Sequence, residues 1–484
     1  MKLSDVLQGV TAKPFSISPD TNITSVTCDS RKVEQGTLFV CISGTVVDGH
    51  TFAATALEKG AAAIVVERDL GLENQIITDN SRRTWAFISA NWFGHPADKL
   101  HLVGVTGTNG KTTTVCLLKS ILEAAGHKVG LVGTIQNMIG DRVLPAARTT
   151  PDTYELQSLF SLMVAEGCTH CVMEVSSHAL DQDRVGCCTF DVGVFTNLTQ
   201  DHLDYHGTME NYMEAKKQLF RISRTAVLNA DDRWCAPLKE NLSTKIVEYS
   251  VKNDRAHYIA KNICFKPDGV RFELVTPDTI GRVKLHIPGE FSVYNGMAAA
   301  AAALSLGVPF DTVTNALHTA SGVKGRAEIV PTDRDFTVVI DYAHTPDGLE
   351  NICKTLKACC EGRLITVFGC GGDRDRTKRP IMGKIAATLS DYVVVTSDNP
   401  RSENPAAIIE DIVVGMKGVK TPFTVIESRI EAIHYAVKNA KAGDTILLAG
   451  KGHETYQILA DGTIHLDERE VVADALQNRK DENV

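Results

Sequence analysis

The sequence predicts an α/β protein of three domains. Three observations support this prediction: the length, the alternation of apolar strands with helical stretches, and two breaks in that alternation. The 484 residues fit about three domains of roughly 150 residues each. Strands followed by helical periodicity predict βαβ units and parallel sheets. The Gly-His-Pro-Ala cluster that ends at Ala97 and a new strand–helix series near residue 330 divide the chain into 1–97, 98–329 and 330–484.

The first segment predicts a small α/β domain. Short apolar strands are expected at Thr37–Ile42, Ala61–Glu67 and Ile76–Thr78, with a helix at Phe52–Lys59 between the first two. A second helical pattern, Ser81–Phe93, runs into the boundary cluster, whose Gly and Pro residues are typical of a domain end.

The second segment predicts a mostly parallel sheet with an antiparallel side sheet. It opens with a strand at His101–Thr106, a glycine-rich turn, a helix at Thr112–Ala125 and a strand at Lys128–Thr134. Further strands are expected at His170–Val175, Asp191–Thr196 and Thr225–Asn229. From Lys245 to Ile287, alternating short strands separated by Pro-Asp turns predict the side sheet. A helix at Val293–Leu306 closes the segment.

The third segment predicts another parallel sheet, because each of its strands is followed by helical periodicity. The strands are expected at Phe336–Asp341, Leu364–Phe368, Tyr392–Thr396 and Thr445–Ala449.

The composition excludes several classes of protein. A formal net charge of -9 argues against a broad nucleic-acid or anionic-lipid surface. The N-terminus lacks the apolar run of a signal peptide, and no apolar stretch approaches the roughly 20 residues that span a bilayer, so a cytoplasmic protein is expected. The 13 cysteines are an odd number in a chain without a secretory signal, so reduced thiols are expected. Cys168, Cys171, Cys187 and Cys188 are expected to be structural and not zinc ligands, because adjacent residues on a strand point to opposite faces.

A glycine-rich turn carries the strongest chemical signal. Between the strand that ends at Thr106 and the next helix lie Gly107, Gly110 and Lys111. In this context backbone N–H groups and a helix N-terminus cradle phosphates, while the lysine reaches the terminal phosphates and the Thr112 hydroxyl binds Mg²⁺. An ordinary glycine-rich turn is the alternative, but it leaves the Lys-Thr pair at the helix start unexplained.

Two other strands end in polar clusters that contain Glu174 and His202. Because ligands gather at the carboxyl ends of parallel strands, both clusters are expected near the phosphate loop as metal ligands or bases. Each residue alone would more often be a solvated or capping group.

Five motifs together resemble the Mur ligase family, the ATP-dependent amide-forming enzymes of peptidoglycan precursor synthesis. They are Thr106-Gly-Thr-Asn-Gly-Lys-Thr112, Met173-Glu-Val-Ser-Ser-His178, Asn197-Leu-Thr-Gln-Asp-His202, Gly325-Arg-Ala-Glu328 and Asp341-Tyr-Ala-His-Thr-Pro346. The resemblance implies a uridine-nucleotide domain at 1–97, a P-loop ATPase domain at 98–329 and a Rossmann-like amino-acid-binding domain at 330–484.

Within the family the chain resembles the members that add meso-2,6-diaminopimelate to UDP-N-acetylmuramoyl-L-alanyl-D-glutamate through an acyl phosphate. The amino-acid-binding residues implied are Arg374, Asp398, Asn399, Pro400, Arg401, Gly450 and Glu454. Diaminopimelate differs from lysine by a second carboxylate, and an arginine guanidinium can bind a carboxylate through two parallel hydrogen bonds. The alternative for Asp398-Asn-Pro-Arg401 is a simple turn after a strand.

The resemblance also implies the ATP and metal site. The ATP-binding residues are Thr106, Gly107, Thr108, Asn109, Gly110, Lys111, Thr112, Thr113, Asn295, Arg326, Asp341 and His344. The implied catalytic residues are Lys111, Glu174, His202, Lys216 and Arg326. The implied Mg²⁺ ligands are Thr112, Glu174, His202 and Lys216. Lys216 is implied to be carbamylated by CO₂, whereas composition alone would place it and Lys217 on a solvated helix face.

For the UDP-muramoyl peptide the resemblance implies Ser30, Thr45, Thr149, Thr150, Ser176, Gln182 and Arg184. The alternative for Thr149-Thr150 is an N-cap of the following helix. A monomer with no nucleic-acid or membrane partner is expected. The competing functions are a lysine-adding or folylpolyglutamate-forming ligase, and a P-loop switch that uses ATP only to change shape.

Overall fold

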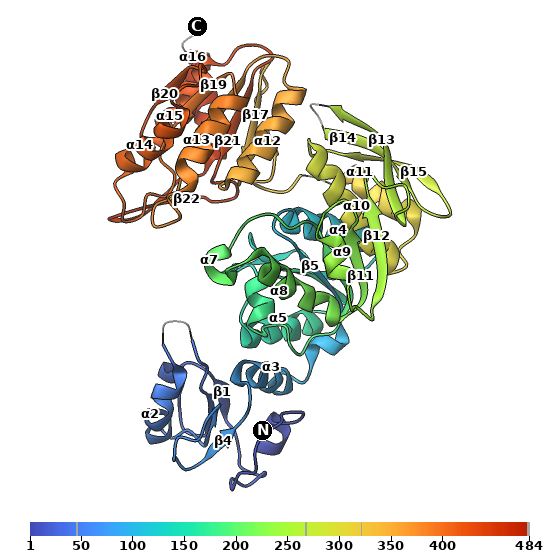
Figure 1. The fold of residues 1–484 in the computed structure, drawn as a ribbon, viewed down its shortest axis with the longest axis vertical. Helices are drawn as coiled ribbons and strands as arrows, with labels where there is room; N and C mark the ends of the chain where they lie inside the picture. Colours follow the sequence, from blue (N-terminus) through green and yellow to red (C-terminus); the bar gives the residue numbers. More distant parts are fainter. Residues whose placement is uncertain (45–46, 267–268, 321, 482–484) are drawn as a thin grey trace. The chain divides into compact units, whose positions relative to one another are not determined.

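The computed structural model describes residues 1–44, 47–266, 269–320 and 322–481. The chain forms two compact units, each built from sheets and helices (Figure 1). Unit 1 comprises Met1–Tyr249 and Ala298–Val313, and unit 2 comprises Ser250–Met297 and Thr314–Val484. Helices α10 (Glu290–Ser305) and α11 (Phe310–Thr319) contribute residues to both units.

Unit 1 begins with a four-stranded parallel sheet that is buried on both faces. Its strands, in sheet order, are β1 (Ser25–Thr27), β2 (Thr37–Val40), β3 (Ala63–Val66) and β4 (Gln75–Ile77). Because alternate residues of a strand face opposite sides, Leu38 and Val40 pack in one apolar cluster while Phe39 and Cys41 pack in another. The helices of this part are α1 (Leu3–Val6), α2 (Ala53–Glu58) and α3 (Ser81–Trp92). Helices α3 and α2 cover the two faces, so the predicted α/β arrangement is confirmed.

The larger sheet of unit 1 is mostly parallel. The strand order is β12-β11-β10-β5-β9-β6-β7-β8, and only β6, β7 and β8 pair antiparallel. The strands are β5 (His101–Thr106), β6 (Val129–Val132), β7 (Asn137–Ile139), β8 (Arg142–Leu144), β9 (His170–Glu174), β10 (Phe190–Phe195), β11 (Ser223–Asn229) and β12 (Lys245–Ser250). The helices are α4 (Lys111–Ala124), α5 (Thr153–Ala165), α6 (Ser177–Asp181), α7 (Leu203–His206), α8 (Met209–Arg221) and α9 (Cys235–Lys239).

One boundary predicted from the sequence was wrong. The antiparallel region was expected to begin at Lys245, but β12 pairs parallel with β11. A short strand with partly exposed positions shows the same alternation of apolar and polar residues whether it pairs parallel or antiparallel. The sequence pattern alone therefore does not distinguish parallel from antiparallel pairing.

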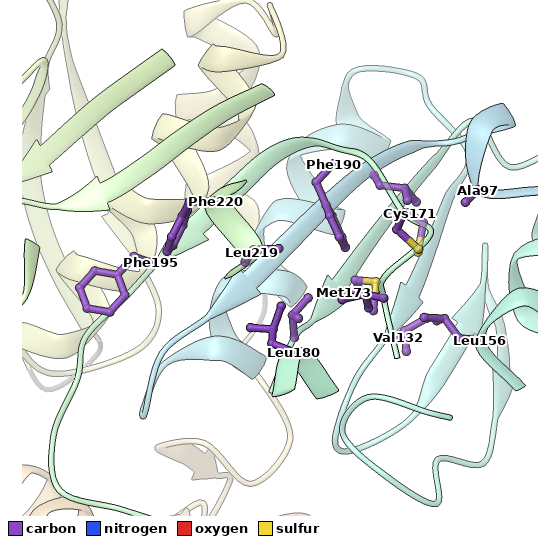
Figure 2. Close-up of a cluster of buried hydrophobic side chains, with 14 of the residues drawn as sticks. Ala97, Val132, Leu156, Cys171, Met173, Leu180, Phe190, Phe195, Leu219 and Phe220 are labelled. Carbon is purple, nitrogen blue, oxygen red and sulfur yellow. The ribbon is translucent and has the colours of Figure 1, made fainter. Parts of the chain in front are cut away.

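Apolar side chains from the larger sheet and its helices form the main core of unit 1 (Figure 2). Met173 of β9 and Phe190 of β10 pack with Leu156 of α5 and with Leu219 and Phe220 of α8, and all five are fully buried. Removing this surface from water stabilises the sheet and its helices as one body. The carboxyl ends of β5, β9 and β10 are thereby held on a rigid support.

At the opposite end of this sheet, three histidine rings pack together. His101 begins β5 and His170 begins β9, with ring centroids 4.8 Å apart, and the His127 ring lies 4.1 Å from that of His170. Burial, together with repulsion from His127 and His101, lowers the pKa of His170 to about 4. The unfolded chain therefore takes up this proton near pH 6.5, whereas the folded chain resists it until about pH 4.

We therefore expect unit 1 to lose stability as the pH falls from 6.5 to 4, by up to about 1 kcal/mol per pH unit from His170. Urea unfolding followed by tryptophan fluorescence tests this, because Trp85, Trp92 and Trp234, the 3 tryptophans of the chain, all lie in unit 1. His170→Gln should flatten the pH dependence in this window. A variant with the same pH dependence as the parent would contradict the assignment.

Unit 2 contains an antiparallel meander, a six-stranded sheet and a hairpin. The meander is β13 (Tyr258–Lys266), β14 (Gly269–Val275) and β15 (Ile280–Leu285). The six-stranded sheet has the order β16 (Glu328–Val330), β17 (Thr337–Asp341), β21 (Thr445–Ala449), β18 (Leu364–Phe368), β19 (Tyr392–Val395) and β20 (Phe423–Val425). All of its pairs are parallel except β16–β17. The parallel sheet predicted for this region is confirmed.

Helices cover the six-stranded sheet of unit 2 (Figure 1). They are α12 (Pro346–Cys359), α13 (Lys378–Leu389), α14 (Pro405–Met416), α15 (Arg429–Asn439) and α16 (Glu468–Asp481). Between β21 and α16 lies the hairpin of β22 (Tyr456–Leu459) and β23 (Gly462–His465). All 13 cysteines are free, as expected. In the part of the chain that the structure describes, no helix combines the length and apolarity needed to cross a bilayer.

Candidate active site

A glycine-rich loop joins β5 to α4 in unit 1. Gly107 has φ 151° and Gly110 has φ 85°, conformations that glycine adopts without strain. A Cβ atom on Gly107 would lie 1.9 Å from Thr196 Oγ1, so the loop has no room for a side chain there. Lys111 Nζ donates to the carbonyl oxygens of Gly107 and Thr108, both at 2.8 Å. A cation therefore lies directly over the loop.

The end of β10 holds this loop in place. Thr196 Oγ1 donates to the Asn109 carbonyl at 2.6 Å, and the Asn109 N–H donates to Asn197 Oδ1 at 2.9 Å. Asn197 Nδ2 also donates to the Asn109 carbonyl at 3.1 Å. Thr112 and Thr113 lie buried in the first turn of α4. The loop is thus a preformed cradle in which N–H groups at a helix start can meet phosphate oxygens.

Lys216 of α8 lies beside the cradle and is almost completely buried, with 1% of its surface exposed. Its Nζ donates to the Gly107 carbonyl at 3.0 Å and sits 4.4 Å from the centroid of the Tyr212 ring. Burial, reinforced by repulsion from Lys111, holds the pKa of Lys216 well below its usual value. The lowered pKa favours the uncharged amine, which is the nucleophilic form of a lysine side chain.

The solvated helix face that composition suggested for the two lysines was wrong for both. Lys217 is 4% exposed, and its Nζ donates to the Pro237 carbonyl at 2.9 Å. Both side chains are buried because α8 packs its apolar residues into the core on either side of them.

Glu174 ends β9 and is 1% exposed. Its Oε1 accepts from the Thr134 N–H at 2.8 Å, and its Oε2 accepts from Thr134 Oγ1 at 3.0 Å. Thr134 Oγ1 also lies within hydrogen-bond distance of Thr149 Oγ1, at 3.0 Å. These bonds hold the carboxylate in one orientation at the carboxyl end of the sheet.

His202 lies at the start of α7 with φ 53°, and its side chain is about half exposed. Its ring centroid lies 4.9 Å from that of His178 and 6.2 Å from that of Tyr212. Tyr212 also reaches the phosphate loop, because its hydroxyl lies 3.3 Å from Thr108 Oγ1. Tyr212 thus contacts both His202 and Lys216.

The residues around the loop fit a loosely held Mg²⁺ better than a closed metal cage. Within the described ranges, no three His, Cys, Asp or Glu side chains converge closely enough to bind a metal. Mg²⁺ is normally held by one or two carboxylates together with water and substrate phosphates. The Glu174 carboxylate and the Thr112 hydroxyl are hard oxygen donors of the kind that such an ion prefers.

Five residues assigned to the muramoyl peptide form one network in unit 1. Thr150 Oγ1 donates to the Glu174 carbonyl at 2.8 Å and accepts from the Ser176 N–H at 3.0 Å. Arg184 donates to the Thr150 carbonyl and to Gln182 Oε1, both at 2.8 Å. Thr149 joins the network through Thr134. The N-cap alternative for Thr149-Thr150 was wrong, since Asp152 is the N-cap residue of α5.

Arg184 has unused hydrogen-bonding capacity. Burial, together with the nearby Arg148, lowers its pKa, and its buried Nε has no hydrogen-bond partner among the described residues. A cavity of about 820 Å³ lies beside this part of the chain, lined by Asp181 and Asp183 on either side of Gln182 and by Arg83 of α3. The space is large enough for a ligand with sugar and peptide groups.

The first-segment residues are less connected to this network. The Ser30 carbonyl accepts a hydrogen bond from Lys59 Nζ at 2.9 Å, and no described contact joins Ser30 to the network. Thr45 lies outside the described residues. The uridine-side assignments therefore stay predictions.

In unit 2, the loop after β19 meets the loop after β21. Asp398, Asn399 and Pro400 are buried. Gly450 has φ 118°, and a Cβ atom on it would lie 2.5 Å from Asp398 Oδ2. Glycine at this position therefore leaves space beside the Asp398 carboxylate, which accepts no hydrogen bond from the described residues. Glu454 Oε2 accepts from Asn399 Nδ2 at 2.9 Å.

Two arginines flank the same part of this loop. A Cβ atom on Gly371 would lie 2.9 Å from Arg401 Nη1 and 3.9 Å from Arg374 Cγ. Arg401, with φ 53°, donates through Nη1 to the Gly372 carbonyl at 2.8 Å. Arg374 Nη1 donates to the Asp373 carbonyl at 3.0 Å. The structure thus places both predicted arginines beside Gly371.

Sequence reasoning missed two buried cations beside these two loops. Lys451 is fully buried and contacts Asn399 and Glu454. Arg429 of α15 is also buried, and it donates to the Ala449 carbonyl at 2.8 Å and to the Ser397 carbonyl at 3.5 Å. Lys451 stands inside the Gly450-Lys-Gly-His-Glu454 motif, which was a usable signal, whereas the sequence around Arg429 offers none.

Three other predicted nucleotide residues of unit 2, Arg326, Asp341 and His344, lie near one another. The Arg326 guanidinium lies 4.8 Å from the centroid of the Tyr342 ring. Asp341 Oδ2 accepts from the Ala327 N–H at 2.7 Å, and burial raises the pKa of Asp341. His344 Nδ1 lies 2.8 Å from the Tyr342 carbonyl oxygen. Asn295 of α10 is buried. Their contacts with nucleotide stay predictions.

A strand, a glycine loop and a helix that carries Lys-Thr, placed on a parallel sheet, define the class of P-loop nucleotide-binding proteins. Family models extend this assignment. The chain matches "Mur ligase family, catalytic domain" over residues 22–89, "Mur ligase middle domain" over 105–303 and "Mur ligase, glutamate ligase domain" over 325–452. The chain belongs to the Mur ligase family, and it is therefore a ligase.

Curated relatives and a solved structure agree with this membership. UDP-N-acetylmuramoyl-L-alanyl-D-glutamate–2,6-diaminopimelate ligase of Caldanaerobacter subterraneus subsp. tengcongensis is 48% identical, over 98% of this chain and 99% of its own. The ligase of the same name from Bacillus velezensis is 47% identical over 98% and 99%. A solved structure of a ligase of this name superposes with a TM-score of 0.75 at 33% identity, covering 99% of each chain.

Proposed function

We propose that this chain uses ATP to join meso-2,6-diaminopimelate to UDP-N-acetylmuramoyl-L-alanyl-D-glutamate, a step of peptidoglycan precursor synthesis. One observation carries the choice of amino acid: in unit 2, Arg401 and Arg374 both lie beside Gly371, and the Asp398 carboxylate lies beside Gly450. Guanidinium groups pair with a carboxylate, and carboxylates pair with an ammonium group. The far end of diaminopimelate carries both.

The reaction follows from the weakness of a carboxylate as an electrophile. A carboxylate oxygen of the D-glutamyl side chain attacks the γ-phosphorus of ATP, the bond from phosphorus to the ADP oxygen breaks, and an acyl phosphate forms. The diaminopimelate amine then attacks the acyl carbon, loses a proton, and inorganic phosphate leaves. Lys111 and the loop N–H groups orient and neutralise the phosphates, and Arg326 adds a further positive charge.

Residues around the loop would hold the metal and the nucleotide. Mg²⁺ would be bound by Thr112, Glu174, His202 and the carboxylated Lys216, and it would supply charge neutralisation on the phosphates. The neutral Lys216 amine attacks the carbon of CO₂ and releases a proton, which converts the side chain to a carbamate. The ATP phosphates would lie on residues 106–113, with Asn295, Asp341 and His344 assigned to the rest of the nucleotide.

The remaining assignments concern the UDP substrate and the organisation of the chain. We assign Thr149, Thr150, Ser176, Gln182 and Arg184 to the muramoyl peptide, and Ser30 with Thr45 to the uridine side. The hydrogen-bond network and the adjacent cavity support the first group. Segments 1–97, 98–329 and 330–484 would act as three domains in a cytoplasmic monomer. The first two each contain one family match, and the third match begins at residue 325, just before the third segment.

Phosphate release tests the proposed function. With ATP, Mg²⁺ and UDP-N-acetylmuramoyl-L-alanyl-D-glutamate, we expect release only when an amino acid is added, with strong preference for meso-diaminopimelate over L-lysine. Mass spectrometry of the product identifies the amide. Preference for lysine would support the ligase activity but contradict the role of the two arginines in selecting diaminopimelate. Phosphate release without any amino acid would favour an ATP-driven switch.

A further inference from the structure

Lys451 brings a positive charge into the interior of unit 2, beside the amino-acid pocket. Its side chain is 0% exposed, and its Nζ lies 2.9 Å from Asn399 Oδ1, 3.0 Å from Glu454 Oε2 and 3.8 Å from Asp398 Oδ1. Burying an ammonium group is costly unless it is paired and hydrogen-bonded. No step of the proposed reaction uses this group, so its position needs another explanation.

Lys451 is one of two groups that fix which way the Asn399 amide faces. Asn399 Oδ1 accepts from two donors, Lys451 Nζ and the Ile458 N–H, each at 2.9 Å. An amide oxygen that meets two donors leaves the amide nitrogen on the other side. There, Asn399 Nδ2 donates to Glu454 Oε2 at 2.9 Å. Without Lys451, one of the two donors that select this orientation is lost.

The same contacts orient the Glu454 carboxylate. Its Oε2 accepts from both Asn399 Nδ2 and Lys451 Nζ, while Oε1 has no hydrogen-bond partner among the described residues. The two carboxylates of Asp398 and Glu454 face the one ammonium of Lys451, which leaves one negative charge uncompensated. That balance suits a ligand that brings one ammonium group of its own.

We propose that Lys451 is a positioning residue of the amino-acid pocket: it holds Asn399 and Glu454 so that one oxygen of Glu454 and the Asp398 carboxylate face the distal ammonium group of the substrate. This inference rests on the proposed function, because it takes diaminopimelate as the ligand of the pocket. Lys451 itself does not touch the substrate and acts through Glu454.

The isosteric variant Lys451→Met tests the inference. We expect the KM for diaminopimelate to rise on the order of 10- to 100-fold, because a misdirected carboxylate loses its alignment with the ammonium group. The KM values for ATP and for the UDP substrate should stay within about twofold of the parent. An unchanged KM for diaminopimelate, or an equal loss for all three substrates, would overturn the inference.

A double-mutant cycle separates positioning from a general structural role. If Lys451 acts through Glu454, the double variant K451M/E454Q should have the same KM for diaminopimelate as Glu454→Gln alone, whereas additive losses would contradict the inference. Lys451→Gln, which keeps one donor for Asn399, replaces the methionine variant if that one does not fold, with the same criteria. Lys384→Met, on the exposed face of α13, is the surface control. Failure of the parent enzyme to use diaminopimelate would reject the proposed function instead.

Discussion

Replacing Arg401 with alanine is expected to lower kcat/KM for meso-diaminopimelate on the order of 100- to 1,000-fold, the cost of removing one partner of a buried charge pair. The distal carboxylate of the substrate loses its guanidinium fork, and the pocket keeps a desolvated anion without a partner. Nucleotide binding should be unchanged, because the phosphate loop is built from unit 1 and Arg401 from unit 2. Initial rates with diaminopimelate and with L-lysine, together with calorimetric titration of ATP, measure both quantities.

Two further variants sharpen this experiment. Arg401→Lys keeps the charge but not the planar fork, so it should recover only part of the activity. Arg376→Ala removes a nearby exposed arginine that pairs with Glu403 and Asp411 at 3.7 and 3.6 Å, and it should behave like the parent. Normal use of diaminopimelate by Arg401→Ala would show that another group selects the amino acid.

Replacing Lys216 with methionine is expected to reduce kcat on the order of 100- to 1,000-fold while leaving the fold intact. The loss follows from the missing carbamate near the phosphates, where charge stabilisation contributes most to phosphoryl transfer. The fold should tolerate the change because methionine fills a similar volume without the cost of burying an amine. Steady-state rates and thermal unfolding measure the two effects.

Carbon-13 NMR with labelled bicarbonate tests the chemistry of Lys216 directly. The parent protein should show a carbamate resonance that Lys216→Met lacks. Lys217→Met is the matched control, since Lys217 is an equally buried neighbour on α8 that contacts the Pro237 carbonyl instead of the loop, and it should keep the resonance. A fully active Lys216→Met protein would reject the role of the carbamate.

Much of the fold and of the phosphate site follows from local sequence patterns. The strand at His101–Thr106, the glycine loop and the helix after it are close neighbours in the chain, so their periodicity and turn chemistry predict them together. Short strands are harder, because three residues such as Ser25–Thr27 carry too little pattern. The parallel pairing of β12 depends on a partner strand that its own alternation does not identify.

Buried charge is what the sequence does not reveal. Lys217 looks like a solvated residue until the packing of α8 is known, and Lys451 meets Asn399 across 52 residues of chain. Whether such a cation is solvated or paired inside the protein depends on which distant loops the sheet brings together. The substrate contacts that motif resemblance assigns stay predictions, whereas the buried cations beside those residues appeared only in the structure.

The buried Arg429 has a consequence for how amino-acid selectivity could change. Its guanidinium binds the main-chain carbonyls of Ser397 and Ala449 and pairs with the buried Glu468. These bonds join the two loops of the pocket through backbone atoms alone, so they do not depend on which side chains the loops carry. A substitution at position 401 can therefore change which amino acid is bound without disturbing the bonds that join the two loops. Substrate preference can then differ between proteins that share this architecture.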